Sequence, residues 1–359
     1  MKTVANFGLV CLLLGSIIGC QQSRSGGSSP FVFDADERLF TAHAFMNVGG
    51  YDMEFNDDGM HPIRTEIRAL LKERLPQAYQ DSIRSYYANH KHSLGDYGTY
   101  AFALTAAPTF GLKFDSLTSS PWASRDIEAL PGLDRHLRAF YRRAKIGELW
   151  QQYRPRLQEQ HDKYRPYASV ALEHLQAYVR VEQLPFNEQR GKLITAFSPL
   201  LSHFQAFTVT VNGDVYLVFG PQPSEPSPSS YYHEAAHHFT DPIVERYRSE
   251  LERLSPLLAL AQEQEGSVSY NVAEESLVRT IDVILTGRLF NSPEEKVRQR
   301  IEDEYRLGFI LCPYLYENLP AFEASDLSLE AYFPKLLSGL DVEKEKQRWT
   351  AFWDDQGAR

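Results

Sequence analysis

Apolar residues recur at helical spacing through most of residues 34–190. Pro62 favours the first turn of a helix, because proline lacks the N–H that a first turn leaves unpaired. The apolar faces that follow include Ile67, Leu70 and Leu71 in one stretch, Leu133, Leu137, Phe140 and Tyr141 in a second, and Leu172, Leu175 and Val179 in a third. These stripes predict packed helices, whose apolar faces form a core rather than a cofactor site.

The spacing of apolar residues changes from helical to strand-like near residue 191. Leu193–Phe197 predicts a short strand, because it is apolar and partly β-branched. Phe207–Val211 and Val215–Phe219 flank Asn212-Gly213-Asp214. Strand-forming residues around Asn-Gly predict a β-hairpin, because Asn and Gly tolerate the positive φ angles of a type I′ turn.

Helical patterns return after a Pro- and Ser-rich stretch. Residues 221–230 predict a loop, since their prolines cannot pair within a central strand. Asp241-Pro242 predicts the start of a new helix, and Ser292–Glu295 resembles a capping box. The chain is therefore expected to be α+β, predominantly helical, with a small sheet before a central helix.

The first residues resemble an export signal with a lipid attachment site. Met1-Lys2 is basic, Leu9–Ile18 is apolar and too short to remain as a membrane span, and Gly19-Cys20 follows. This pattern is similar to the lipobox of bacterial lipoproteins, which implies cleavage before Cys20 and a diacylglycerol on its thiol. The alternative is an ordinary signal peptide, or a buried helix in which the cysteine occurs by chance. Residues 1–20 are interpreted as the signal peptide and 21–33 as a flexible tether.

The composition is that of a globular, acidic protein. Among 359 residues, Lys and Arg number 37 against 47 for Asp and Glu, which gives a net charge of −10. No basic tract is present, which argues against nucleic-acid binding. The cysteines are Cys11, Cys20 and Cys312, so the mature body keeps one thiol and has no disulfide framework. Cys312 is expected to be an inert buried thiol, with a reactive thiol as the alternative.

The strongest chemical signal is the run His233-Glu234-Ala235-Ala236-His237. Residues four apart share one face of a helix, so the imidazoles of His233 and His237 can both reach one Zn²⁺ ion. Glu234 lies at the edge of that face, where its carboxylate can take a proton from the metal-bound water. A surface helix with two unrelated histidines is the alternative.

A third ligand is needed for a catalytic zinc site. The further histidine of the metzincin pattern is missing, because Ile243 occupies its position. Glu274 and Glu275 are the candidates from a later helix. Helical periodicity puts Glu274 on the apolar face and Glu275 beside it, aligned with Arg279. Two solvated acids in a first helical turn are the alternative interpretation.

Two segments resemble a family of bacterial zincin-like proteins of the gluzincin type, which are lipoproteins predicted to be metallopeptidases. Residues 233–244 are similar to its His-Glu-x-x-His segment, and residues 275–279 match its later Glu-x-Leu-Val-Arg segment. Glu274 stands in place of that family's asparagine, and Thr280 in place of its alanine. The resemblance implies a zincin-like fold and Glu275 as the third ligand. A weaker likeness extends to residues 45–51 and 86–90.

Other roles are expected around this centre. Asp282 is a candidate to orient a zinc histidine. Arg279 is a candidate partner of Glu275 or of Asp282, with a purely structural role as the alternative. The strand 215–219 is expected to be a sheet edge that binds an extended peptide by β-addition, and the alternative is a strand that only covers the helix. The tyrosines that could stabilise an oxyanion are Tyr231, Tyr305, Tyr314 and Tyr316.

The sequence as a whole predicts a zinc metallopeptidase anchored by lipid in the bacterial cell envelope. Residues 34–190 form an N-terminal helical region in this interpretation, and 191–359 form the zincin-like catalytic region. Gln21 follows the lipidated cysteine and favours the outer membrane. The alternatives are a non-catalytic envelope scaffold with the same fold, and hydrolysis of another amide, such as one in cell-wall peptide.

Overall fold

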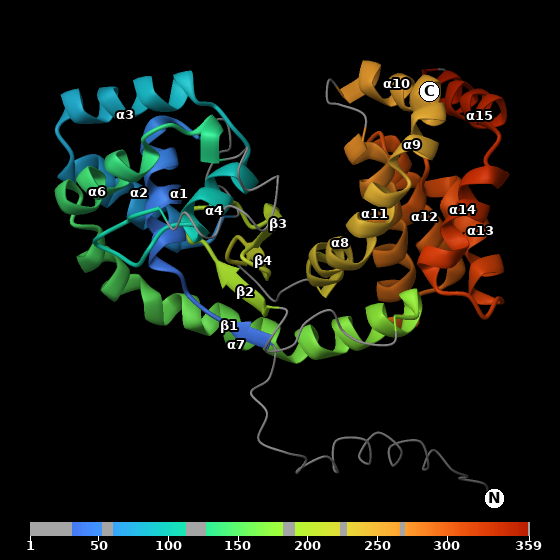
Figure 1. Cartoon of the computed structure of the whole chain (residues 1–359), viewed down its shortest axis with the longest axis horizontal. Helices are drawn as coiled ribbons and strands as arrows, with labels where there is room; N and C mark the ends of the chain where they lie inside the picture. The colour runs from blue at the N-terminus through green and yellow to red at the C-terminus, as the bar shows by residue number, and fades with distance from the viewer. Residues whose placement is uncertain are drawn as a thin grey trace, which may run out of the picture.

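The computed structural model is mainly helical with one small sheet, which confirms the predicted α+β class (Figure 1). It describes residues 31–51, 60–112, 127–181, 191–222, 228–265 and 270–357. The signal peptide, Cys20 and residues 21–30 of the tether lie outside these ranges. Within them, no helix combines the length and the apolar character that crossing a membrane requires.

The N-terminal half is built from helices around a common core. They are α1 (Glu37–Gly49), α2 (Pro62–Arg74), α3 (Gln77–Asn89), α4 (Leu94–Phe102), α6 (Leu133–Arg143) and α7 (Ile146–Val179). Pro62 begins α2 as predicted, and the Asp36 carboxylate caps α1 by accepting from two backbone N–H groups. Helix α7 runs beneath both halves of the molecule in Figure 1 and packs against α6, β2 and α8.

In the described part of the chain, four strands form a sheet in the order β1-β2-β4-β3. They are β1 (Phe31–Phe33), β2 (Leu193–Phe197), β3 (Ala206–Val211) and β4 (Asp214–Phe219). β1, β2 and β4 are parallel, and β3 is antiparallel to β4. The hairpin is confirmed, with φ of 58° at Asn212 and 83° at Gly213, as a type I′ turn requires.

The sheet corrects two predictions from the sequence. The tether was predicted to reach residue 33, but residues 31–33 pair with β2 as the strand β1. The strand 215–219 was predicted to be the sheet edge, but β4 lies between β2 and β3, so β3 is the edge. The physical reason is that strand pairing extends the sheet beyond the hairpin: β2 pairs with β4, and β1, from far away in the sequence, pairs with β2.

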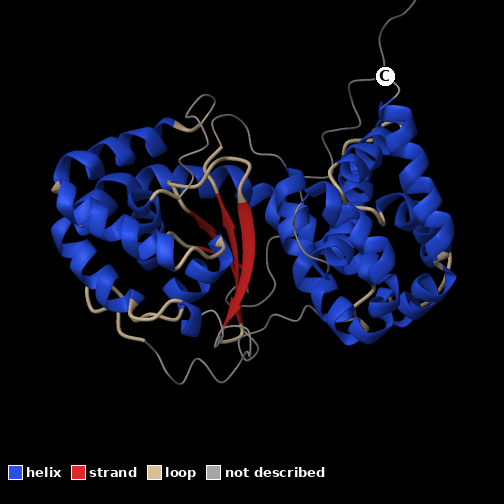
Figure 2. Ribbon diagram, turned by 90° about the horizontal axis from the view of Figure 1, so that it is seen from above, coloured by secondary structure: helices blue, strands red, loops and turns tan. Residues whose placement is uncertain are grey.

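The sheet also joins the two regions that the sequence pattern separates at residue 191. β1 precedes the N-terminal helices, and α4 packs against β3. In Figure 2 the strands lie on the side of the N-terminal helices, with the C-terminal helices across from them. The two sides meet where α8 (Pro228–Arg246) contacts β3.

From residue 228 onward the described residues form helices and the short turns between them. After α8 come α9 (Arg248–Leu251), the 3₁₀ helix η2 (Glu252–Leu254), α10 (Ser255–Glu265), α11 (Tyr270–Leu289), α12 (Glu294–Arg306), α13 (Cys312–Glu323), α14 (Leu329–Gly339) and α15 (Val342–Gly357). α8 packs on α7 and, more extensively, on α11. This pairing places the two candidate motifs on adjacent helices.

Three local predictions in this half are wrong. The loop predicted for 221–230 ends sooner, because α8 begins at Pro228. Pro242 does not begin a helix but lies inside α8, where packing on both neighbours outweighs one lost hydrogen bond. Ser292–Glu295 forms no capping box: the N-cap is Pro293, which has no side-chain donor or acceptor.

Cys312 is fully buried, and burial raises the pKa of its thiol to about 12, as expected of an inert thiol.

His161 is a buried polar residue whose replacement tests the packing of α7 on the sheet. Its ring lies between Phe33 and Phe197, and neither ring nitrogen has a hydrogen-bond partner among the described residues. Burial lowers its pKa to about 4.

We therefore expect His161→Leu to be stabilising by about 1 kcal/mol at pH 7, because it removes unpaired buried polar atoms. The advantage should grow below pH 6.5, because there the wild-type imidazole takes up a proton in the unfolded state but not in the folded state, where its pKa is about 4, so the wild type loses stability as the pH falls. Thermal unfolding of both chains at pH 7 and pH 5 measures this. A variant that melts lower than the wild type at both values would contradict it.

Candidate metal centre

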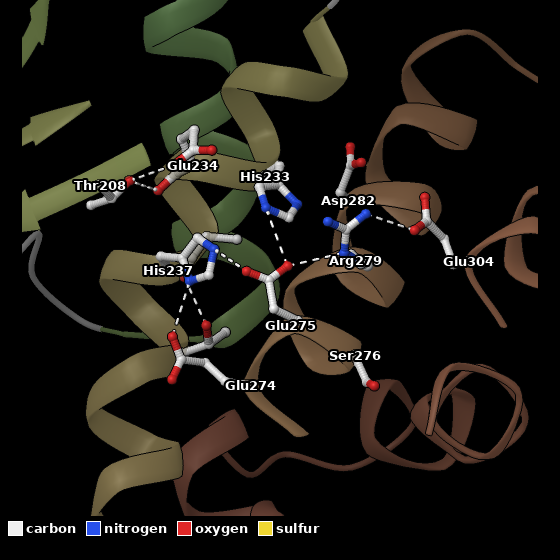
Figure 3. Close-up of polar contacts among 12 residues, drawn as sticks. Thr208, His233, Glu234, His237, Glu274, Glu275, Ser276, Arg279, Asp282 and Glu304 are labelled. Carbon is white, nitrogen blue, oxygen red and sulfur yellow. Dashed lines mark hydrogen bonds and ion pairs between the residues drawn. The ribbon is translucent and has the colours of Figure 1, made fainter. Parts of the chain in front are cut away.

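Two packed helices supply the candidate ligands. His233, Glu234 and His237 lie in the middle of α8, and Glu274 and Glu275 lie in the first part of α11 (Figure 3). One helical turn separates the two histidines, so their rings stand on the same face, with centroids 5.0 Å apart. α11 crosses that face and brings its carboxylates to them.

Glu275 lies between the two imidazoles. Its Oε2 is 3.6 Å from Nε2 of His233, and its Oε1 is 3.4 Å from Nε2 of His237. One ligand atom from each of the three residues falls within 4.8 Å of the others, so the three side chains can hold a metal ion. Two imidazole nitrogens and one carboxylate oxygen are a donor set typical of catalytic Zn²⁺.

The other nitrogen of His237 faces two further carboxylates. Nδ1 donates to Oδ1 of Asp241 over 3.0 Å, and Oε1 of Glu274 lies 3.3 Å away. Carboxylates in this position fix the tautomer of a metal-binding histidine and leave Nε2 for the ion. His237, Asp241 and Glu274 also form a second group whose ligand atoms lie within 4.8 Å of one another. Glu274 and Glu275 therefore face opposite nitrogens of the His237 ring.

The ionisation of these groups reflects burial and their neighbours. Burial lowers the pKa of His233 to about 3, which keeps its imidazole neutral as a metal ligand must be. Burial would raise the pKa of Glu275, but hydrogen bonding by His237 and the charges of His233, His237 and Arg279 lower it to about 2. Burial opposes protonation of His237 as well, yet the surrounding carboxylates raise its pKa well above the usual value. Binding of a cation at Nε2 requires release of that proton.

Glu234 is held apart from the ligand group by the edge strand. The hydroxyl of Thr208 on β3 contacts Oε2 of Glu234 at 2.8 Å and its carbonyl oxygen at 3.0 Å. Glu234 is 5% exposed, and burial raises the pKa of its carboxyl to about 7. A carboxylate with a pKa near neutrality is suited to accept and return a proton at physiological pH.

All of these groups line one cavity of about 480 Å³. One wall comes from the edge strand and the segment before it, with Phe204 56% exposed at this wall. The opposite walls are the faces of α8 and α11, with Glu304 contributed by α12. The cavity therefore adjoins both the histidine pair and the side of β3 with which no described strand pairs.

Asp282 lies in the wall of this cavity but does not contact either histidine, contrary to the role predicted for it. Its Oδ2 accepts from the Ser229 hydroxyl over 2.6 Å and lies 3.6 Å from Arg300. At this position along α11 the nearest part of α8 is its beginning, so Asp282 contacts that end of the helix instead. Asp241 takes the predicted role at His237.

The tyrosines named for oxyanion stabilisation are placed elsewhere. Tyr231 is buried and bonds Thr195, Tyr314 donates to the Leu336 carbonyl, and Tyr305 packs on Trp349. Tyr316 lines a different cavity, between α11, α12 and α13. None of the four is among the described residues that line the cavity with the histidines.

The sequence interpretation missed three residues of the site. Asp241 stands four residues after His237 on the same helix, so helical spacing could have identified it. Thr208 and Glu304 reach the site from β3 and α12, and no spacing along the chain links them to the His-Glu motif. Only the packing of separate elements brings them together.

Comparison of the chain with protein-family models, with curated proteins and with solved structures found no match. The resemblance to zincin-like lipoproteins consequently remains a prediction from two motifs. The spatial arrangement of those motifs is the observation on which a functional proposal has to stand.

Proposed function

We propose that this protein is a zinc-dependent metallopeptidase with a zincin-like fold, anchored to the bacterial cell envelope through lipid on Cys20. The observation that carries the proposal is the convergence of His233 and His237 on α8 with Glu275 on α11. Glu234 lies one residue along from the first histidine, at the same cavity. A cysteine preceded by an apolar run supports the anchor.

The donor set fits zinc better than a hard cation. His233 and His237 would hold the ion through their Nε2 atoms, and Glu275 through a carboxylate oxygen. When bound, zinc supplies a Lewis acid that polarises the scissile carbonyl and lowers the pKa of water. Asp241 keeps its hydrogen bond to Nδ1 of His237, which holds that ring in the orientation the ion needs.

Glu234 is the proton carrier in this proposal. Its carboxylate accepts a proton from the attacking water and delivers it to the departing amine, so Glu234 ends the reaction as the same carboxylate with which it began. Burial poises its pKa near 7, and the Thr208 hydroxyl holds one carboxylate oxygen. Thr208 thus links the base to the strand beside which a peptide would lie.

The edge strand β3 is suited to hold the substrate. Val211 and Asp214 pair across the two-residue turn, so alternate residues, including Thr208, direct their N–H and C=O groups to the side of β3 that no described strand covers. Main-chain pairing of this kind recognises extended peptides irrespective of their side chains. The substrate class we propose is therefore a peptide or protein segment in extended conformation.

A direct test is metal analysis of purified residues 21–359 with turnover of a broad peptide library. We expect about one zinc ion per chain, hydrolysis that a chelator abolishes, and recovery when zinc is restored. Zinc binding without cleavage of any library member would favour the competing function, a non-catalytic envelope scaffold. The buried Glu234 carboxylate favours catalysis over that competitor, because a scaffold gains nothing from a desolvated acid.

The edge strand can be tested separately from the metal. Thr208→Pro removes the outward N–H and the hydroxyl, whereas Thr208→Val removes the hydroxyl alone. We expect Thr208→Pro to raise KM for peptides by about 3–10-fold relative to Thr208→Val, the effect of one lost hydrogen bond. Proline is tolerated on a sheet edge, so zinc content should be equal in both. Equal KM values in the two variants would show that substrate does not pair with this strand.

A further inference from the structure

Arg279 connects the candidate metal ligand to a helix outside the site. Its Nε donates to Oε2 of Glu275 over 2.9 Å, and its Nη1 donates to Oε2 of Glu304 on α12 over 2.7 Å. The guanidinium carbon also lies 3.8 Å from the ring centroid of Phe309. Figure 3 shows the guanidinium between the two carboxylates, and the Phe309 ring adds an aromatic face to the same cation.

We propose that Arg279 is a positioning residue for Glu275, and that Glu304 holds Arg279 in place, so that α12 helps to set the metal affinity of the centre. This inference rests on the proposed zinc site. Arg279 occupies Oε2 of Glu275 and leaves Oε1, the oxygen nearer to His237, for an ion. It thereby selects one rotamer of a side chain that would otherwise sample several.

Burial makes these contacts stronger than an ordinary surface pair. The side chains of Arg279, Glu275 and Glu304 are 26%, 25% and 19% exposed. Glu275 and Arg279 also stand four residues apart on α11, with the acid on the N-terminal side, which is the favourable orientation. Without Glu304 the arginine would keep one charge partner, but nothing from α12 would hold the far end of its guanidinium.

The geometry of the contact requires arginine rather than any cation. A guanidinium donates along fixed directions from Nε and Nη1 at once, while the ammonium of lysine is a single point of charge on a flexible stem. Lysine at this position can approach Glu275 or Glu304 but cannot hold both with the same alignment. The Phe309 ring adds a flat surface that a guanidinium matches.

The test measures zinc affinity by competition with a chromophoric chelator, so it does not depend on turnover. We expect Arg279→Gln to raise the dissociation constant about 10–100-fold, as for other residues that orient metal ligands. Arg279→Lys should fall between that variant and the wild type, and Glu304→Gln should raise the constant about tenfold. The double variant should bind zinc within about threefold of Arg279→Gln, because Glu304 acts through Arg279.

Arg288 provides a matched control, because it lies on the same helix and pairs with Glu323 of α13, away from the histidines. Arg288→Gln should leave zinc affinity unchanged. Circular dichroism of each metal-free variant checks folding. If replacement of the buried Arg279 prevents folding, Glu304→Gln still tests the inference, because it removes the partner of Arg279 and leaves Arg279 itself in place.

Unchanged zinc affinity in a folded Arg279→Gln chain would overturn the inference while leaving the proposed zinc site intact. Multiplying effects in the double variant would overturn the role of Glu304. A wild-type chain that holds no zinc would overturn both this inference and the proposed function.

Discussion

Replacement of Glu234 by glutamine is expected to abolish peptide hydrolysis while zinc remains bound. Glutamine has the same shape but cannot accept the proton of the attacking water, and loss of a general base lowers kcat by about 10²–10⁴-fold. The variant should fold, because glutamine fits the buried position of Glu234 and its amide oxygen can still accept a hydrogen bond from Thr208. Zinc should stay near one per chain, since Glu234 is outside the ligand group.

The matched control for this experiment is Glu245→Gln, which removes an exposed acid from the same helix, where Glu245 pairs with Arg248. It should leave both zinc content and turnover unchanged. If Glu234→Gln retained zinc and hydrolysed peptides at a rate within about threefold of the wild type, Glu234 would not be the base. Loss of zinc and activity together would instead assign Glu234 to the metal.

The parts of the fold that the sequence predicted are those set by local chemistry. Asn212 and Gly213 determine a turn by their tolerance of positive φ, and the hairpin formed as expected. The His-Glu motif was readable because helical spacing alone puts His233 and His237 on one face. In each case the information lies within a few consecutive residues.

The parts that the sequence did not predict depend on distant partners. The strand β1 at residues 31–33 was interpreted as tether, because a three-residue strand has no pattern of its own and exists by pairing with β2. The sequence pattern predicts β4 as the sheet edge, since nothing in its residues shows that β2 covers its other side. Pro242 signals a helix start locally, but packing of α8 on α7 and α11 overrides that signal.

The choice between Glu274 and Glu275 shows why periodicity was insufficient. Both lie in the first part of one helix, and their apolar neighbours distinguish core from surface but not one imidazole nitrogen from another. In the structure Glu275 faces Nε2 of both histidines, whereas Glu274 faces only Nδ1 of His237. The two acids can therefore be separated by their effect on the metal.

Glu275→Gln is expected to weaken zinc binding by more than the 10–100-fold that residues outside the ligand group contribute. It removes the anionic ligand and also leaves Arg279 with Glu304 alone. Glu274→Gln should weaken binding less than about tenfold, because Asp241 still accepts from Nδ1 of His237. Chelator competition on both variants, with folding checked by circular dichroism, gives the comparison.

The reverse order of effects would move the ion to the other side of the His237 ring. Nδ1 of His237, Asp241 and Glu274 form a group of similar compactness, so a dominant effect of Glu274→Gln would assign the ion there. That group has one imidazole and two carboxylates and excludes His233, so His233→Ala would then leave the affinity unchanged. Under the proposed centre, His233→Ala should lower zinc affinity as severely as Glu275→Gln, since each removes one of three protein ligands.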